Sequence, residues 1–141
     1  MIKTAKLPAK FTPGNYDLQI KRSAAGLGLF AGEELPKGVC LIEYVGRTIS
    51  KAEEFTSRSK YLFEINKNKT IDGQARANKA RYINHSCRPN AEIEIRQGRI
   101  FVLSRRKIKI GEEICYDYGE EYWDEHIKPH GCRCQKCASA R

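Results

Sequence analysis

Apolar residues occur along this chain in short runs that glycine, proline and charged residues interrupt. Residues 91–96 (AEIEIR) alternate apolar and charged side chains, as a strand with one buried face does. Residues 51–60 favour a short helical turn that begins near Ser50, and residues 78–84 favour another. Further strands are predicted over residues 17–22, 26–31, 39–46, 61–65, 69–73, 99–108 and 112–118. The pattern therefore predicts a mainly β fold of short strands with short connections.

The same pattern argues against two other classes of protein. No segment with helical periodicity is long enough for a βαβ unit, which disfavours a doubly wound parallel α/β fold. No apolar run approaches the roughly 20 residues of a transmembrane helix, so we expect no membrane contact. Residues 1–22 carry lysines but no apolar stretch of the kind found in signal peptides. The 141 residues suit one domain, in which residues 1–16 form an irregular arm.

The charge is unevenly distributed along the chain. The formal net charge is +9, which favours contact with nucleic acid or another anionic surface, although general solubility explains it equally well. One basic patch consists of Arg105, Arg106, Lys107 and Lys109. Residues 112–125 are instead acidic and contain no basic residue. This run is either a solvated loop or a negative mouth that attracts a cationic peptide.

Two segments carry the strongest functional signal. Residues 81–90 read RYINHSCRPN, and residues 111–118 read GEEICYDY. In order and separation they resemble the two signature motifs of the SET-domain protein lysine methyltransferases. Shorter matches extend the resemblance over about residues 17–137; they are Ser23–Phe30 with its GxG turn, Glu43–Gly46, Tyr61–Glu64 and Ile71–Gly73. Ala77 and Tyr82 depart from the family pattern, which usually has Gly and Phe there.

The resemblance implies a fold and a methyl donor. The expected fold is a strand-rich SET domain over residues 17–120, in which the two motif segments form a pseudoknot. The donor would be S-adenosylmethionine, with glycines that let the main chain approach it closely. The implied cofactor-binding residues are Gly26, Leu27, Gly28, Tyr61, Arg81, Asn84, His85 and Trp123. We expect His85 to hold the methionyl end or the knot rather than to transfer a proton.

The implied chemistry is the methylation of a lysine amine. The reaction needs a neutral amine, whereas a lysine in water has a pKa of about 10.4. An aromatic channel and a nearby sulfonium cation both lower that pKa. By resemblance Tyr118 is the central catalytic residue, Tyr61 lines the channel, and Tyr116 occupies a position that selects the product. A hydroxyl at Tyr116 takes up the room of further methyl groups, which predicts mono-methylation with some di-methylation.

The C-terminal cysteines predict a metal site. Cys132, Cys134 and Cys137 lie too close in sequence for all three to pair in disulfides with one another, and structural zinc takes four ligands. The resemblance to a post-SET segment over residues 121–141 implies Cys87 as the fourth ligand of one zinc ion, with His130 as the alternative. A redox CxxC pair or thiols without metal are the competing interpretations.

The zinc would fold the tail over the active site, where Tyr122 or Trp123 would cover the adenine. Cys40 and Cys115 lie in predicted strands and are expected to be small buried residues. This use of cysteine indicates a reducing, intracellular compartment. That compartment is the nucleus if the protein is eukaryotic or acts in a host, and otherwise the cytoplasm.

The sequence thus favours an S-adenosylmethionine-dependent methyltransferase that acts on a lysine of a histone. The first alternative is methylation of another basic protein. The second is an inactive SET-like module that binds a peptide or nucleic acid through its basic surface. Nucleic-acid contact through Arg105–Lys109 remains open under each interpretation.

Overall fold

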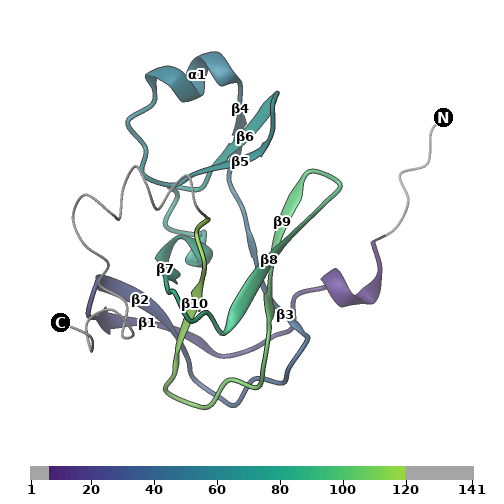
Figure 1. Ribbon diagram of the computed structural model, residues 1–141, viewed down its shortest axis with the longest axis vertical. Helices are drawn as coiled ribbons and strands as arrows, with labels where there is room; N and C mark the ends of the chain where they lie inside the picture. Colours follow the sequence, from purple (N-terminus) through teal and green to yellow (C-terminus); the bar gives the residue numbers. More distant parts are fainter. Residues whose placement is uncertain (1–6, 120–141) are drawn as a thin grey trace.

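The computed structural model describes residues 7–119 and shows three small sheets joined by short connections (Figure 1). Within these residues the helical elements are one α-helix and two short 3-10 turns. The prediction of a mainly β fold with small sheets is therefore confirmed. The domain boundaries at residues 17–120 and 121–141 remain predictions.

The first sheet brings the two motif segments together. Its order is β1 (Leu18–Ser23), β2 (Gly26–Ala31), β10 (Glu113–Tyr116) and β7 (Asn84–His85). β1 and β2 form an antiparallel hairpin, and β10 adds to β2 in antiparallel orientation. β7 pairs with β10 in parallel, so that the NHSC segment and the C-terminal strand lie side by side.

The second sheet supplies most of the core. β9 (Arg99–Ser104) lies between β3 (Cys40–Tyr44) and β8 (Ala91–Arg96), and all its pairings are antiparallel. β8 and β9 are joined at Gln97 and Gly98, which both have positive φ, at 52° and 72°. Such turns match the right-handed twist of a hairpin. The fully buried residues of this sheet pack with those of the first sheet in one cluster; examples are Leu29, Ile100, Val102 and Ile114.

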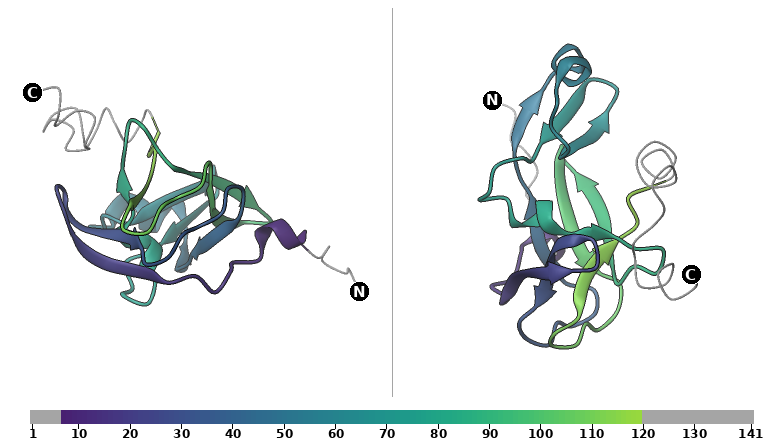
Figure 2. Two further views of the ribbon diagram at one scale, coloured as in Figure 1. Left: turned by 90° about the horizontal axis from the view of Figure 1, so that it is seen from below. Right: turned by 90° about the vertical axis from the view of Figure 1, so that its left-hand side faces the viewer.

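The third sheet is an insertion at one end of the molecule. It consists of β4 (Arg47–Ile49), β6 (Lys69–Asp72) and β5 (Leu62–Asn66), with α1 (Lys51–Thr56) between β4 and β5. Figure 2 shows α1 at the end of the molecule opposite the β1–β2 hairpin.

Polar contacts hold α1 in place, since the helix buries none of its side chains. The Ser50 hydroxyl accepts a hydrogen bond from the Glu53 amide at 3.1 Å, which confirms the predicted start of the helix. Lys51 Nζ lies 2.9 Å from Glu54 Oε2 and 3.1 Å from Thr70 Oγ1. The hydrogen bond from Lys51 lowers the pKa of Glu54.

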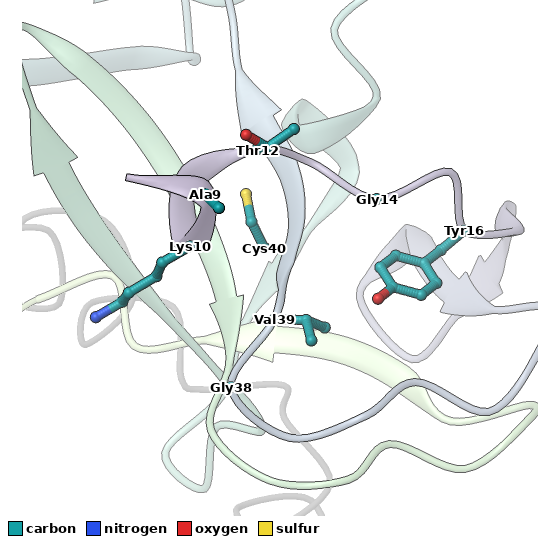
Figure 3. A pocket seen from close by; sticks show the side chains of 8 residues that line it. All are labelled: Ala9, Lys10, Thr12, Gly14, Tyr16, Gly38, Val39 and Cys40. Atoms are coloured by element: carbon teal, nitrogen blue, oxygen red, sulfur yellow. The ribbon is translucent and has the colours of Figure 1, made fainter. Parts of the chain in front are cut away.

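The chain before β1 crosses the outside of β3. Ala9–Phe11 forms a 3-10 turn, and the Phe11 ring lies 5.3 Å from that of Phe101. The Gly14 amide donates to the Cys40 carbonyl at 3.1 Å. Together these segments line a small hollow, toward which the Cys40 thiol points (Figure 3). Burial raises the pKa of Cys40 to about 11, so that the thiol is neutral at neutral pH.

Several boundaries differ from the sequence prediction. Cys40 is buried as expected, whereas Cys115 is only half-buried. β9 ends at Ser104, because the chain leaves the sheet there. Residues 105–112 contain Ile108, which forms an isolated antiparallel bridge with Leu35 in the loop between β2 and β3. The helical turn expected over residues 78–84 is the 3-10 turn η2 (Lys79–Tyr82) followed by the two-residue strand β7.

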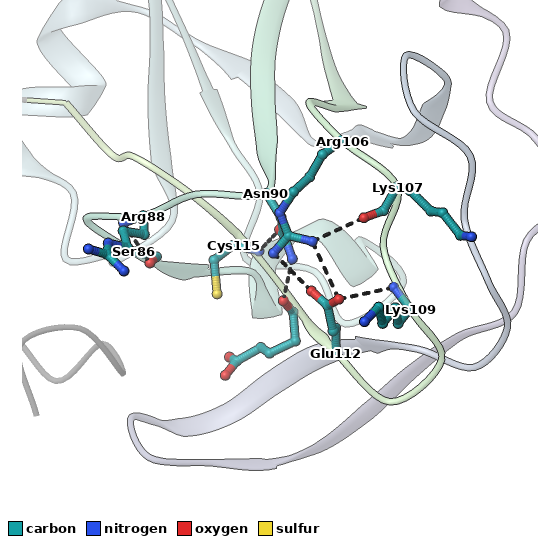
Figure 4. Close-up of polar contacts among 9 residues, drawn as sticks. Ser86, Arg88, Asn90, Arg106, Lys107, Lys109, Glu112 and Cys115 are labelled. Carbon is teal, nitrogen blue, oxygen red and sulfur yellow. Dashed lines mark hydrogen bonds and ion pairs between the residues drawn. The ribbon is translucent and has the colours of Figure 1, made fainter. Parts of the chain in front are cut away.

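Asn90 fastens β10 to the NHSC segment. Its Nδ2 donates to the Glu113 carbonyl at 2.8 Å, and its Oδ1 accepts from the Cys115 amide at 2.9 Å (Figure 4). Its own carbonyl accepts from the Arg105 amide at 2.9 Å. Asn90 itself is 4% exposed. A single amide therefore satisfies two backbone groups of β10.

Replacing Asn90 by alanine leaves a partly buried carbonyl and a partly buried amide of β10 without this partner. We expect the free energy of unfolding to fall by about 2–4 kcal/mol. Asn90→Asp keeps the acceptor for Cys115 but cannot donate to Glu113, so we expect about half of that loss. Urea denaturation measures both, with the exposed Asn68→Ala as control. Equal stability of the Asn90→Ala and Asn68→Ala proteins would contradict this role.

Candidate active site

The turn between β1 and β2 presents main-chain atoms at the surface. Gly26 has φ +105°, a conformation that side chains rarely allow. An added Cβ at Gly28 would lie 2.4 Å from Glu113 Oε2, so a side chain there would displace that carboxylate. Gly26 and Leu27 are exposed, and Leu27 is 51% exposed. The turn thus offers its backbone to a ligand, as expected of a GxG segment.

Asn84 lies directly behind this turn. Its Nδ2 is 3.0 Å from the Leu27 carbonyl oxygen, 3.1 Å from Ser23 Oγ and 2.8 Å from Glu113 Oε2. A carbonyl and a carboxylate can only accept, which fixes the orientation of the amide. Within residues 7–119, Oδ1 receives no hydrogen bond. The amide therefore has an oxygen available for a donor on a ligand.

His85 is held as a neutral imidazole. Its Nδ1 accepts the Tyr118 amide proton at 3.1 Å, which requires that this nitrogen carry no proton. Burial lowers the pKa of His85, although Asp117, with Oδ1 3.8 Å from Nδ1, opposes the shift. The other ring nitrogen, Nε2, lies 3.5 Å from Cys87 Sγ. This arrangement suits a residue that supports the knot, as expected, better than one that exchanges protons.

Tyr118 lies at the crossing of the two motif segments. Its hydroxyl donates to the Ile83 carbonyl. Its ring centroid is 4.9 Å from that of Tyr116 and 5.5 Å from that of His85. Tyr116 is 7% exposed, whereas Tyr118 is half-buried. Two of the three tyrosines expected at the reaction centre, Tyr116 and Tyr118, are therefore in one cluster.

Tyr61 joins the site through Arg81. Arg81 Nη2 donates to the Tyr61 hydroxyl at 3.2 Å, and the guanidinium carbon lies 4.2 Å from the Tyr61 ring centroid. The Tyr61 carbonyl also accepts from the Tyr44 hydroxyl at 2.7 Å. Arg81, expected among the cofactor-binding residues, thus contacts the expected channel wall rather than Asn84 or the Gly26–Gly28 turn.

The remaining expected site residues cannot be placed. Cys132, Cys134, Cys137, Trp123 and the alternatives Tyr122 and His130 lie outside the described residues. Across residues 7–119, no group of three or more His, Cys, Asp or Glu side chains could hold a metal ion. Of the four expected zinc ligands, only Cys87 is described, so the zinc site remains a prediction.

Sequence reasoning missed Glu113 as a site residue. The signal was present, since Glu113 belongs to the GEEICYDY motif and its alternation with Ile114 places it on the face opposite the core. The sequence does not show the pairing of β10 with β2 and β7, which brings the Glu113 carboxylate next to Gly28 and Asn84. That contact depends on strands far apart in the chain.

Two of the four cations of the basic patch are paired. Arg106 Nη2 lies 3.0 Å from Glu112 Oε2, and Lys107 Nζ lies 3.3 Å from Glu34 Oε1. Figure 4 shows Arg106 directed at Glu112. Separately, none of the helices in residues 7–119 is long and apolar enough to cross a membrane.

Comparison with known proteins gives consistent matches. A sequence profile of the SET domain matches residues 26–119. Histone-lysine N-methyltransferase trr of Drosophila melanogaster is 38% identical over 125 residues, which are 79% of this chain and 5% of that protein. Histone-lysine N-methyltransferase EHMT1 of Homo sapiens is 36% identical over 132 residues, which cover 83% of this chain and 10% of that protein. This chain thus spans a small part of these relatives.

Solved structures share the fold as well. The ctPRC2 complex in an autoinhibited conformation bound to S-adenosylmethionine matches with a TM-score of 0.68 and 30% identity, over 75% of this chain and 15% of that one. KRYPTONITE in complex with mCHG DNA and SAH matches with a TM-score of 0.67 and 31% identity, over 79% of this chain and 25% of that one.

Replacing Glu113 by alanine removes a charged acceptor from the Asn84 amide. We expect the affinity for S-adenosylmethionine to fall about tenfold, and less in Glu113→Gln, which keeps an acceptor oxygen. Isothermal titration calorimetry measures the dissociation constants, with Glu92→Ala on the exposed side of β8 as control. If Glu113→Ala binds as tightly as Glu92→Ala does, Glu113 has no part in holding the donor.

Proposed function

Because this chain belongs to the SET-domain family, we propose that it transfers a methyl group from S-adenosylmethionine to a lysine amine of a protein. The observation that carries the proposal is the parallel pairing of β7 with β10. This pairing places Asn84, which contacts the Gly26–Gly28 turn, beside the strand that leads into Tyr118. A donor-binding surface and a tyrosine cluster therefore adjoin each other.

The described residues fit the proposed donor. S-adenosylmethionine supplies an electrophilic methyl group on a sulfonium, and it also carries an ammonium group. The Oδ1 atom of Asn84 is oriented to accept from such an ammonium, and the Glu113 carboxylate next to it favours a cation. The exposed main chain of Gly26 and Leu27 offers further contacts. His85 supports this surface by binding the Tyr118 backbone.

The tyrosine cluster suits the acceptor amine. In the proposed step the neutral lysine nitrogen forms a bond to the methyl carbon as the carbon–sulfur bond breaks, with its electron pair returning to sulfur. The methylated nitrogen then loses a proton to solvent. Tyr118 can accept a hydrogen bond from the amine and fix its direction, while Tyr61 and Tyr116 enclose it. A phenol of pKa about 10 is a poor base near neutral pH, so positioning is the role we assign to Tyr118.

The tail completes the proposed enzyme. We assign residues 17–120 to the SET domain and residues 121–141 to a zinc-binding segment that covers the site. The ligands of one zinc ion would be Cys87, Cys132, Cys134 and Cys137. Four thiolates are a donor set that structural zinc accepts. Trp123 would then contribute to the donor site.

The proposed substrate is a histone lysine or a lysine of another basic protein. The relatives named above are histone-lysine methyltransferases, which supports a histone and a nuclear location. KRYPTONITE was solved with DNA, which supports nucleic-acid contact by this protein as well. Arg105 and Lys109 are exposed and form no ion pair within residues 7–119, so they are the cations of the patch best suited to phosphate.

An inactive binding module is the second candidate. The basic surface supports it, since the chain carries a net charge of +9. The arrangement of Asn84 and Glu113 around the glycine turn favours the enzyme, because a module that only binds a peptide needs no site for a methyl donor. Binding of S-adenosylmethionine separates the two functions.

Tyr118→Phe is expected to lower methyl transfer about a hundredfold, because a positioned hydroxyl is lost at the reacting centre. The measurement is transfer of labelled methyl from S-adenosylmethionine into core histones and into a total lysate. Tyr16→Phe, a half-buried tyrosine outside the site, is the control and should retain activity. No label in either pool together with no donor binding by the wild type would support the binding module instead.

Tyr116→Phe is expected to move the product from mono-methyl-lysine toward di- and tri-methyl-lysine. The hydroxyl occupies space and can hold the amine, and removing it makes room for further methyl groups. Mass spectrometry of a methylated peptide measures the distribution, again with Tyr16→Phe as control. An unchanged distribution would show that Tyr116 does not select the product.

A further inference from the structure

Arg81 differs from the other arginines of the described chain. Within residues 7–119 it is the one arginine that is not exposed. No carboxylate in this range forms an ion pair with it, whereas the arginines with ion pairs are Arg47, Arg96, Arg99 and Arg106. Its Nε is buried and has no hydrogen-bond partner within the described residues. This partly buried positive charge therefore has no ion-pair partner within the described residues.

Aromatic rings partly shield this charge from water. The guanidinium carbon lies 4.2 Å from the Tyr61 ring centroid and 5.0 Å from the Tyr82 ring centroid. Nη1 donates to the Gln74 carbonyl, and Nη2 donates to the Tyr61 hydroxyl. These neutral partners hold the guanidinium in place without cancelling its charge. Its field is consequently screened less than that of a surface arginine.

Arg81 lies close in the chain to the groups that hold Tyr61 and Tyr118. Its side chain holds Tyr61, and two residues along the chain the Ile83 carbonyl accepts the Tyr118 hydroxyl proton. One short segment thus holds two of the three tyrosines that the proposed function places around the target amine. The charge of Arg81 lies against Tyr61, which the proposed function assigns to the channel wall.

We propose that Arg81 is a positioning residue that holds Tyr61 and, through its charge, keeps the amine of the bound target lysine neutral. The inference rests on the proposed function. A cation beside the channel disfavours the ammonium form of the lysine, which loses its proton to solvent before the nitrogen attacks the methyl group. A guanidinium remains protonated throughout, so Arg81 is not the base.

None of the other charged groups around the proposed channel forms an ion pair with Arg81 within residues 7–119. Asp72 is buried, and its Oδ1 accepts from the Ser59 hydroxyl at 2.7 Å and the Gln74 amide at 3.3 Å. Asp117 is 61% exposed, so water screens it. The remaining titratable groups on the adjoining elements are Tyr61, Tyr82, Tyr116, Tyr118, His85 and Glu113. The His85 ring accepts from the Tyr118 amide, and the Glu113 carboxylate accepts from Asn84.

The test is the pH dependence of a single turnover with the peptide and S-adenosylmethionine both bound. In Arg81→Gln we expect the midpoint of the rising limb to move up by about one pH unit, so that the rate below the midpoint falls about tenfold and recovers at high pH. Arg81→Lys keeps the charge and should keep the wild-type midpoint. Arg96→Gln, which removes an exposed arginine on β8, is the matched control.

The outcomes separate this inference from the proposed function. An unchanged midpoint in Arg81→Gln, with or without a lower rate at every pH, overturns the inference and leaves the enzyme assignment standing. A midpoint that also rises in Arg81→Lys assigns the effect to packing and equally overturns it. A wild-type protein that transfers no methyl at any pH overturns both proposals.

A second measurement does not need turnover. A peptide with a carbon-13-labelled lysine side chain is titrated by NMR in complex with the protein and S-adenosylhomocysteine, which lacks the sulfonium charge. The bound amine should titrate below the amine of the unbound peptide, and about one unit higher in Arg81→Gln than in the wild type. Equal midpoints in the two proteins contradict the role of Arg81, and thermal unfolding confirms that each variant is folded.

Discussion

The site depends on the pairing of β10 with β7, which Asn90 secures. β10 is short, and on its own it could not hold Tyr118 in place. Its backbone is fixed on one side by β2 and on the other by β7, and Asn90 binds the Glu113 carbonyl and the Cys115 amide within it. Asn90 is buried and these bonds are partly buried, so losing them would leave polar backbone groups of β10 without this partner. The position of Tyr118 is therefore determined by hydrogen bonds several residues away from it.

Residues 81–85 transmit this constraint to the proposed chemistry. Arg81 holds the Tyr61 ring, the Ile83 carbonyl binds the Tyr118 hydroxyl, and Asn84 binds the glycine turn. One stretch of backbone held by these contacts thus links the proposed methyl-donor surface to the proposed aromatic channel. Rate gains from alignment require such rigidity, since small displacements of the reacting atoms are costly. Strand pairing rather than a flexible loop supplies it here.

The sequence predicted local features well and long-range contacts poorly. The strand over residues 91–96 and the Ser50 cap were confirmed because both signals come from neighbours in the chain. The strand β7 was missed, since a two-residue strand has no periodicity and exists only through its partner. Glu113 was missed as a site residue for the same reason. Its motif was visible in the sequence, but its contact with Asn84 exists only in the assembled sheet. For Arg81, resemblance suggested the donor, whereas the fold directs its side chain to Tyr61.

Pairing, rather than net charge, determines the electrostatics of the site. The chain carries +9, and residues 112–125 are acidic, yet within the described part of that run Glu112 binds Arg106 and Glu113 binds Asn84. Asp117 is then the acidic side chain of this stretch that remains largely exposed. Arg81, by contrast, is a cation whose hydrogen-bond partners are neutral. Under the proposed function, the exposed Asp117 would attract the ammonium form of a target lysine, and the shielded charge of Arg81 would favour its neutral amine. Methyl transfer to lysine requires that neutral form.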